Sequence, residues 1–195
     1  MPLTKTTTID NIDPWWDIGA GTLEVGNTES LSSDYASLLY IEACPIEALA
    51  QDGMEIIIEI SYANDNWVKH EAIKTATIDT PVETDLDGAL SATDTAVALT
   101  DGMFFSEVGE KWFIWDTDNN SNSEIVRNKS VSGADKVLCS GVVNAHADAM
   151  PVFSDAESWA VELPLSAAMV RVLYNNVDAD CDMAVTTRIS KVTAL

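Results

Sequence analysis

Apolar and polar residues alternate with a period of two in the segment GMEIIIEISYA, which begins at Gly53. Ile56, Ile58 and Ile60 fall on one face of an extended chain, while the two glutamates of the segment fall on the opposite face. This period is that of a β-strand with one buried face, and it is incompatible with the 3.6-residue period of an amphipathic helix. The segment therefore predicts a core strand, and it limits the chain to folds that contain a sheet.

Two pairs of strands look like hairpins. The segment NDNWVKHEAI follows the first strand directly, so Asn64-Asp65-Asn66 is predicted to be a hairpin turn, with the partner strand starting at Trp67. Near the end of the chain, AMVRVLYNNV and MAVTTRISKV flank the polar stretch from Asp178 to Asp182. We expect these two strands to form a second hairpin around that stretch.

Short strands separated by polar turns recur along the chain, and long helical periodicity does not. We predict an all-β protein, a β-sandwich with an inserted small β-domain. The expected division is an N-terminal arm at residues 1–19, a sandwich formed by residues 20–81 and 157–195, and the inserted domain at residues 82–156. Insertion is tolerated because the entropy of loop closure grows slowly with loop length.

The charge balance excludes several classes of partner. The 195 residues include 32 Asp and Glu against 10 Lys and Arg, a formal net charge of -22. Such a surface repels phosphate backbones and anionic membranes, so neither nucleic acid nor a membrane is an expected partner. The start of the chain shows no apolar signal segment and no stretch long enough for a bilayer span. The acidity fits either adaptation to a salty medium or steering of a basic partner.

One polar segment, from Asp116 to Glu124, places oxygen-bearing side chains at every second position. It fits either a cation-binding loop or a turn between two strands. A calcium loop of the EF-hand type requires Gly at its sixth position and Glu at its twelfth. Counted from Asp116, these positions hold Ser121 and Arg127. We therefore predict a turn between strands, and we assign no metal and no cofactor to the chain.

The sequence offers no catalytic constellation. His70 and His146 lie in segments without a neighbouring motif, and the chain has no Gly-x-Ser-x-Gly elbow and no phosphate-binding glycine loop. Both histidines are expected to be structural or solvent-facing. With 32 acidic residues, pairs of carboxylates at a catalytic separation arise by chance, so their abundance favours no hydrolase. We predict that the chain is not an enzyme.

Trp15 and Trp16 stand together in the segment IDPWWDIG. Two adjacent tryptophans ahead of the first confidently predicted strand are hard to bury together in one face of a sandwich. Tryptophan is favoured at binding hot spots, which makes the pair a candidate anchor for a partner. The alternative is ordinary packing within the chain.

Two stretches resemble proteins of tailed-bacteriophage virions. GMEIIIEISYANDNWVKHEAI is similar to their small sandwich domains, and the middle of the chain is similar to a short β-module of head and tail proteins. The elements of that module follow in order: Trp112 to Asp116, Glu124 to Val126, Ala145 to Ala147, and then Pro151 with Val152. The resemblance implies a structural component of the virion, without catalytic residues.

The resemblance implies a capsid decoration or cement protein, made in the host cytoplasm and placed on the capsid exterior. Its partners would be the major capsid protein or other virion proteins, and it would form a closed homo-oligomer, a trimer. Two alternatives stay open. One is a tail component or host-facing fibre, and the other is a carbohydrate-binding β-module whose exposed tryptophans stack on sugars.

Overall fold

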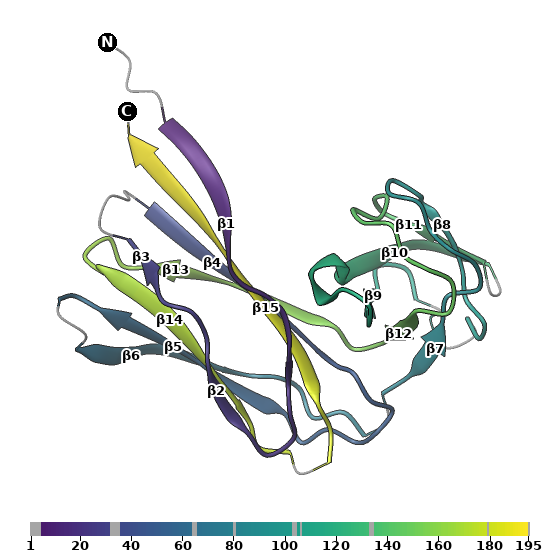
Figure 1. The fold of residues 1–195 in the computed structure, drawn as a ribbon, viewed down its shortest axis with the longest axis horizontal. Coiled ribbons are helices and arrows are strands. Elements are labelled where there is room, and N and C mark those ends of the chain that lie inside the picture. Colours follow the sequence, from purple (N-terminus) through teal and green to yellow (C-terminus); the bar gives the residue numbers. More distant parts are fainter. Residues whose placement is uncertain are drawn as a thin grey trace. The chain divides into compact units, whose positions relative to one another are not determined.

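The computed structural model describes residues 5–31, 36–63, 66–79, 81–102, 105, 107–132, 135–178 and 180–194. Fifteen β-strands and a single turn of 3-10 helix make up the regular structure of these residues, and the strand pairs are antiparallel (Figure 1). The prediction of an all-β fold is confirmed. The chain divides into two compact units. Unit 1 contains residues 1–43, 52–77 and 158–195, and unit 2 contains residues 44–51 and 78–157.

Unit 1 is a sandwich of two sheets. The first sheet has the order β1 (Lys5–Ile18), β15 (Met183–Ala194), β4 (Ala36–Pro45) and β13 (Glu157–Leu163). The second has the order β2 (Leu23–Val25), β14 (Met169–Asn176), β5 (Met54–Ser61) and β6 (Trp67–Lys74), and the short β3 (Glu29–Ser30) also pairs with β14. Inward-facing residues of both sheets form one hydrophobic cluster, which includes the predicted isoleucines 56, 58 and 60 of β5. The sandwich follows from that alternation, because each sheet must bury its apolar face against another.

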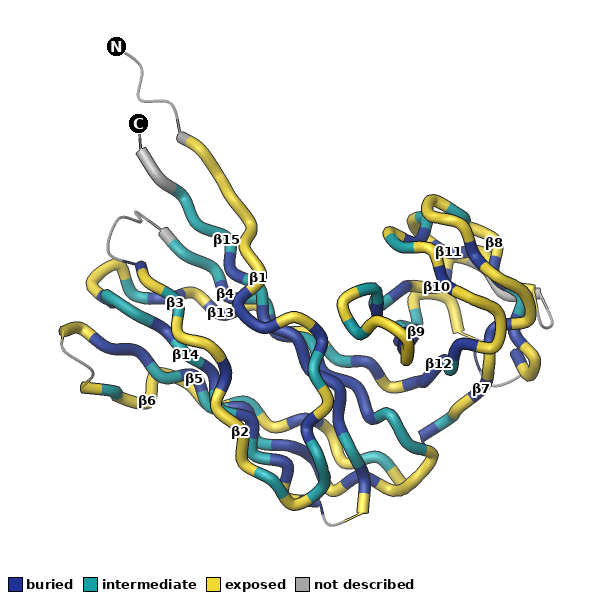
Figure 2. Tube along the Cα trace, viewed as in Figure 1, coloured by how far each residue is buried: buried dark blue, intermediate teal, exposed yellow. Residues whose placement is uncertain are grey.

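Residues 5–18 are a paired strand and not an arm, contrary to the expectation for residues 1–19 from the sequence. Strand β1 pairs with β15 from Lys5, opposite Ala194, to Ile18, opposite Met183. The register shifts between Asn11 and Trp16, around Pro14, which has no N–H to donate to a ladder. Exposure changes along the strand: residues 6–11 are all exposed, whereas buried residues appear from Ile12 onward (Figure 2). The threonine-rich start of the chain alternates only weakly between apolar and polar residues, so the sequence did not predict this strand.

The second predicted hairpin is also wrong. Strand β14 pairs with β5, β2 and β3, whereas β15 pairs with β1, so the two strands lie in opposite sheets (Figure 1). The connection between them is held by Asn176, whose side-chain amide donates to the backbone oxygens of Ile18 and Cys181. The first hairpin is confirmed, since Ser61 of β5 lies opposite Trp67 of β6. Its predicted turn residues Asn64 and Asp65 lie outside the described residues, as does residue 179 of the second connection.

Unit 2 is a six-stranded sheet that closes on itself. Its order is β7 (Glu83–Asp85), β12 (Pro151–Phe153), β9 (Lys111–Ile114), β10 (Glu124–Ser132), β11 (Asp135–Leu138) and β8 (Ala96–Ala98). The amide of Thr100 donates to the Asp85 oxygen, and that of Asp87 donates to the Ala98 oxygen, which joins the first strand of this order to the last. A separate hydrophobic cluster around Trp112 fills the interior. Residues 44–51 belong to this unit, where Gln51 bridges to Ile78, so the unit differs from the predicted range 82–156.

The described part of the chain holds no helix with the length and apolar character needed to cross a bilayer.

Candidate functional site

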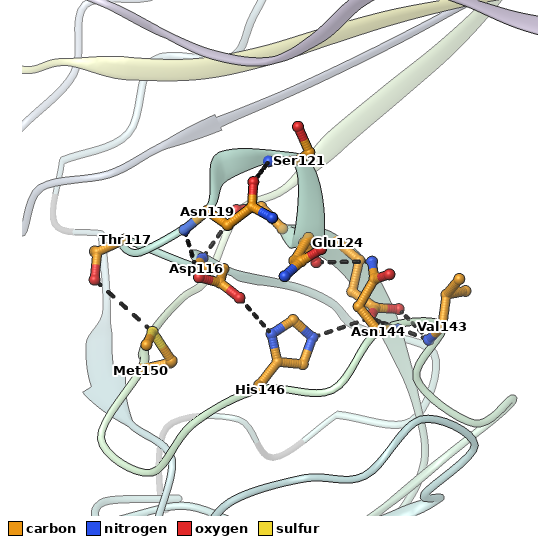
Figure 3. Close-up of polar contacts among 11 residues, drawn as sticks. Asp116, Thr117, Asn119, Ser121, Glu124, Val143, Asn144, His146 and Met150 are labelled. Carbon is orange, nitrogen blue, oxygen red and sulfur yellow. Dashed lines mark hydrogen bonds and ion pairs between the residues drawn. The ribbon is translucent and has the colours of Figure 1, made fainter.

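A buried charged cluster in unit 2 brings together three residues that the sequence keeps far apart. Asp116 follows β9, Glu124 begins β10, and His146 lies in the loop between β11 and β12. Figure 3 shows the imidazole ring lying between the two carboxylates. The side chain of His146 has no exposed surface, and those of Asp116 and Glu124 are 6% and 12% exposed. We call these three residues the 116/124/146 cluster.

The turn that carries the two acids is the one predicted from the sequence. Strands β9 and β10 pair with Ile114 opposite Glu124, and a single 3-10 turn, η1 (Asn120–Asn122), connects them. One oxygen of Asp116 accepts the amide of Asn119 at 2.8 Å, and the amide of Asp116 donates to the Ser123 hydroxyl at 2.8 Å. These short-range bonds are those expected of Asx side chains in a turn. The prediction of a hairpin turn is confirmed.

Glu124 binds the loop that carries His146. Its carboxylate accepts the amide of Val143 at 2.8 and 3.0 Å and the amide of Asn144 at 2.9 Å. The backbone of His146 is held independently, because it exchanges two hydrogen bonds with Leu90, at 2.9 and 3.0 Å. The ring is therefore positioned by backbone contacts on one side and by Glu124 on the other.

The ring nitrogens of His146 both face carboxylates. Nε2 lies 3.0 Å from Glu124 Oε1, and since a carboxylate can only accept, Nε2 carries the hydrogen. Nδ1 lies 3.7 Å from Asp116 Oδ2 and makes no hydrogen bond in the structure.

This geometry suits a brace and not a reaction centre. A histidine base must contact the nucleophile that it activates, whereas both nitrogens of His146 face acids. The oxygens of Glu124 are already used by backbone amides, and one oxygen of Asp116 is used in the same way. Among the described residues, no group of three or more His, Cys, Asp or Glu is arranged to hold a metal ion. The cluster thus ties the β9–β10 turn to the loop after β11.

His146 was missed as a partner of these acids by the sequence analysis. It stands 22 residues after Glu124, in the segment NAHADAM, and nothing in that segment indicates that it is buried. His70, the other histidine, is exposed on β6, where its Nε2 lies 3.1 Å from the backbone oxygen of Glu162 on β13. His70 therefore links the edge strands of the two sheets of unit 1.

A second buried polar group lies in unit 1. Asp13, in the irregular part of β1, is fully buried and accepts the Tyr174 hydroxyl at 3.0 Å. Its other oxygen accepts the backbone and side-chain nitrogens of Asn27, at 2.8 and 2.9 Å. Tyr174 also contacts the hydroxyl of Thr187 on β15. Burial and the nearby Asp13 carboxylate raise the pKa of Tyr174 well above its ordinary value. The group joins three strands.

The candidate anchor residues pack inside the fold. Trp15 is 8% exposed, and Trp16 is half-buried against the core of unit 1, where it meets Tyr174 edge-on at 5.9 Å. The β1 irregularity explains how both can be covered, because it breaks the strict alternation of faces between Asp13 and Trp16. Both side chains therefore pack within the chain, and a partner contact through Trp15 and Trp16 stays a prediction.

No protein-family model and no curated protein matches the chain. Solved structures that resemble it weakly come from viral particles. A chain of the T13 particle of infectious bursal disease virus is 10% identical, with 98% of this chain and 78% of that chain covered at a TM-score of 0.25. VP17, a capsid protein of bacteriophage P23-77, is 6% identical, with 97% and 96% covered at a TM-score of 0.19.

A third such structure is the VP2 subviral particle of infectious bursal disease virus, which is 7% identical. The match covers 98% of this chain and 42% of the VP2 chain, at a TM-score of 0.25. These scores are too low for the likeness to carry an argument about fold or function. The fold assignment therefore rests on the strands of this chain alone.

Proposed function

We propose that the chain is a non-enzymatic structural component of a virus particle, a decoration or cement protein on the capsid exterior. The observation that carries the structural part of this proposal is the 116/124/146 cluster. Its carboxylates bind backbone amides and the His146 ring, and so connect the loop after β11 to the β9–β10 turn; they do not face a substrate. The virion part is supported by the resemblance of the sequence to phage head and tail modules.

A protein that bridges capsid subunits needs a contact surface on more than one part of its own fold. Each unit exposes large apolar side chains, which would be buried on binding. Unit 1 exposes Ile9 and Leu165, at 67% and 73%, and unit 2 exposes Val108 and Val143, at 69% and 76%. These side chains support bridging through both units, and the surplus of acidic residues would keep decorated particles from aggregating.

The carbohydrate-binding alternative loses its main support. Stacking on a sugar requires an open aromatic face. All six tryptophans are described, and each is buried or half-buried. Trp112 and Trp115 are 0% and 9% exposed, and Arg171 covers the ring of Trp67 at 4.2 Å. We do not propose this function.

Immunogold electron microscopy tests the proposal. Antibodies raised against the purified chain would be applied to intact particles from lysates of the organism that encodes it, with pre-immune serum as the control. We expect gold on the surface of filled heads. Gold confined to tails would replace the decoration role by a tail or fibre role. Unlabelled particles, both intact and opened, would overturn a virion role.

Cementing has a separate test. Particles assembled without the chain should release their genome at a lower temperature than complete particles, and purified chain added back should restore the difference. Equal release temperatures with and without the chain would contradict cementing while leaving surface decoration intact.

A further inference from the structure

Within the part of the chain that the structure describes, the outer edge of β1 has no strand partner. β1 is the terminal strand of its sheet, and its only partner in the described strand order is β15. Every residue from Thr6 to Asn11 is exposed, and Figure 2 shows this part of β1 as a continuous exposed stretch. We call residues 6–11 the β1 edge. In an antiparallel ladder, alternate residues direct their N–H and C=O groups away from the partner strand, so this edge presents backbone groups along about 20 Å.

The β1 edge ends where the structure covers it. The side-chain amide of Asn27 donates to the Ile12 oxygen at 3.0 Å, and the backbone of Asn27 donates to Asp13. At Ile12 and Asp13 the chain itself therefore covers the strand. The continuous exposed stretch before them is residues 6–11, in the sequence TTTIDN.

Other long edges of unit 1 carry the charges that natural proteins use to prevent pairing. Strand β6 presents Lys69, His70, Glu71 and Lys74, and strand β13 presents Glu157 and Glu162. Charged side chains on an edge strand discourage a second strand from docking. The β1 edge has threonines and an isoleucine in their place, residues that favour strand structure.

The one charged residue of the β1 edge is partly compensated within the chain. Asp10 lies 3.4 Å from Lys191 of β15, which also contacts Glu29. Burial lowers the pKa of Lys191, but its bonds to Glu29 and Asp10 outweigh this and raise it, so the ammonium stays charged at neutral pH. Lys191 thus partly offsets the charge of Asp10, the one acidic residue of the β1 edge, on a chain whose net charge is -22.

We propose that the β1 edge pairs with the β1 edge of a second copy of this chain, antiparallel and about a two-fold axis. Two copies of so acidic a chain approach most easily where the charge is low, and residues 6–11 carry a single acidic side chain, which lies beside Lys191. Pairing would extend the four-stranded sheet of each copy into one continuous sheet. Ile9, which is 67% exposed and lies opposite Ser190 on the outer face of the sheet, would be covered by the second copy.

This inference deepens the proposed function, since it names the contact by which a particle component would associate with itself. The predicted trimer requires a contact between two different surfaces, whereas self-pairing of one edge closes as a dimer. The two models therefore differ in the mass of the assembly.

The test is the mass of the full chain in solution, measured by sedimentation equilibrium at 0.15 and 1 M NaCl. We expect twice the 21.1 kDa of one chain, with tighter association at high salt because the Debye length falls from about 8 to about 3 Å. The Ile9→Glu variant should be a monomer. Val68→Glu is the matched control, because Val68 is a half-exposed β-branched residue on the charged edge strand β6, and it should remain a dimer.

Hydrogen exchange shows whether the edge itself is the contact. Amides at alternate positions of residues 6–11 should exchange at least tenfold more slowly in the wild-type dimer than in the Ile9→Glu variant. A wild-type monomer or trimer, a dimer that survives Ile9→Glu, or unchanged exchange in residues 6–11 would each overturn the proposal. Gold-labelled particles with a monomeric chain would refute only the pairing, and a dimer without labelled particles would refute only the virion role.

Discussion

Glu124 is the residue on which the connection between the β9–β10 turn and the loop after β11 depends. Its carboxylate holds two backbone amides and the His146 ring in an environment that is nearly closed to water. Removing it leaves the buried Nε2 of His146 and the part-buried amide of Asn144 without an acceptor, and each such group costs about 1–3 kcal/mol.

Glu124→Ala is therefore expected to lower the free energy of unfolding of unit 2 by roughly 3 kcal/mol. Urea denaturation followed by tryptophan fluorescence would measure it, since Trp112 and Trp115 lie in that unit. Asp118→Ala, at an exposed position of the same turn, is the control and should change stability by less than about 0.5 kcal/mol. Equal effects of the two substitutions would mean that the cluster does not brace the loop.

Gly26 has a comparable role in unit 1. A Cβ at this position would lie 2.3 Å from the Asp13 carboxylate and 3.1 Å from the Val172 backbone oxygen. Gly26→Ala should displace a fully buried carboxylate and cost about 2–3 kcal/mol. Gly19→Ala is the control, because its nearest neighbour would lie 3.7 Å away. Thermal unfolding of the two variants would compare them, and a Gly26→Ala variant as stable as Gly19→Ala would refute the tight approach.

At the scale of elements, the Asp13–Tyr174 bond joins β1, β14 and β15. The pKa of folded Tyr174 is raised above the value near 10 of an unfolded chain, mainly by burial and then by Asp13. Between the two values the unfolded chain loses the tyrosine proton while the folded chain keeps it. The stability contributed by Tyr174 is therefore present below pH 10 and is lost as the pH rises above it.

Tyr174→Phe should consequently be less stable than the wild type at pH 8, by about 1–3 kcal/mol, and the difference should shrink between pH 10 and 11. Urea titrations at these pH values would measure it. Lys191, whose pKa is also raised, weakens both proteins at high pH, so its contribution cancels in the comparison. A difference that stays constant with pH would contradict the shifted ionisation.

The elements also show what the sequence can and cannot predict. The period-two pattern of β5 identified a strand with one buried face, and the polar segment after Trp112 identified a turn, because both are local properties. Pairing partners are not local. The alternation of β14 and β15 is compatible with a hairpin, yet the two strands lie in different sheets of the sandwich. The side chain of Asn176 stabilises the connection between the sheets through its hydrogen bond to Ile18. The approach of His146 to Glu124 likewise depends on the closure of unit 2, which no spacing encodes.

For the whole molecule, the two separate hydrophobic clusters imply two cooperative units. Scanning calorimetry of the full chain should show two transitions. Glu124→Ala is expected to move only the transition of unit 2, and Gly26→Ala only that of unit 1. A single transition shifted equally by both substitutions would show that the chain unfolds as one body.

The net charge of -22 acts on the whole molecule as self-repulsion. Adding salt from 0.05 to 1 M should raise the unfolding temperature, because the repulsion is screened within a few ångströms at high ionic strength. NaCl and KCl should act alike if screening is the cause. An unfolding temperature that is independent of salt would argue that the acids are placed for a partner.

The pairing of β1 with β15 also governs the order in which the chain can fold during synthesis. The strands of unit 2 lie between Glu83 and Phe153, so that unit has all its strands well before the ribosome reaches β15. Strand β1 emerges first and its partner, Met183–Ala194, emerges last, so the sandwich must wait while its first strand stays unpaired. Throughout this wait, the threonine-rich strand has open edges on both sides. Early contacts between nascent chains on neighbouring ribosomes would therefore form at the same strand that we propose joins two finished copies.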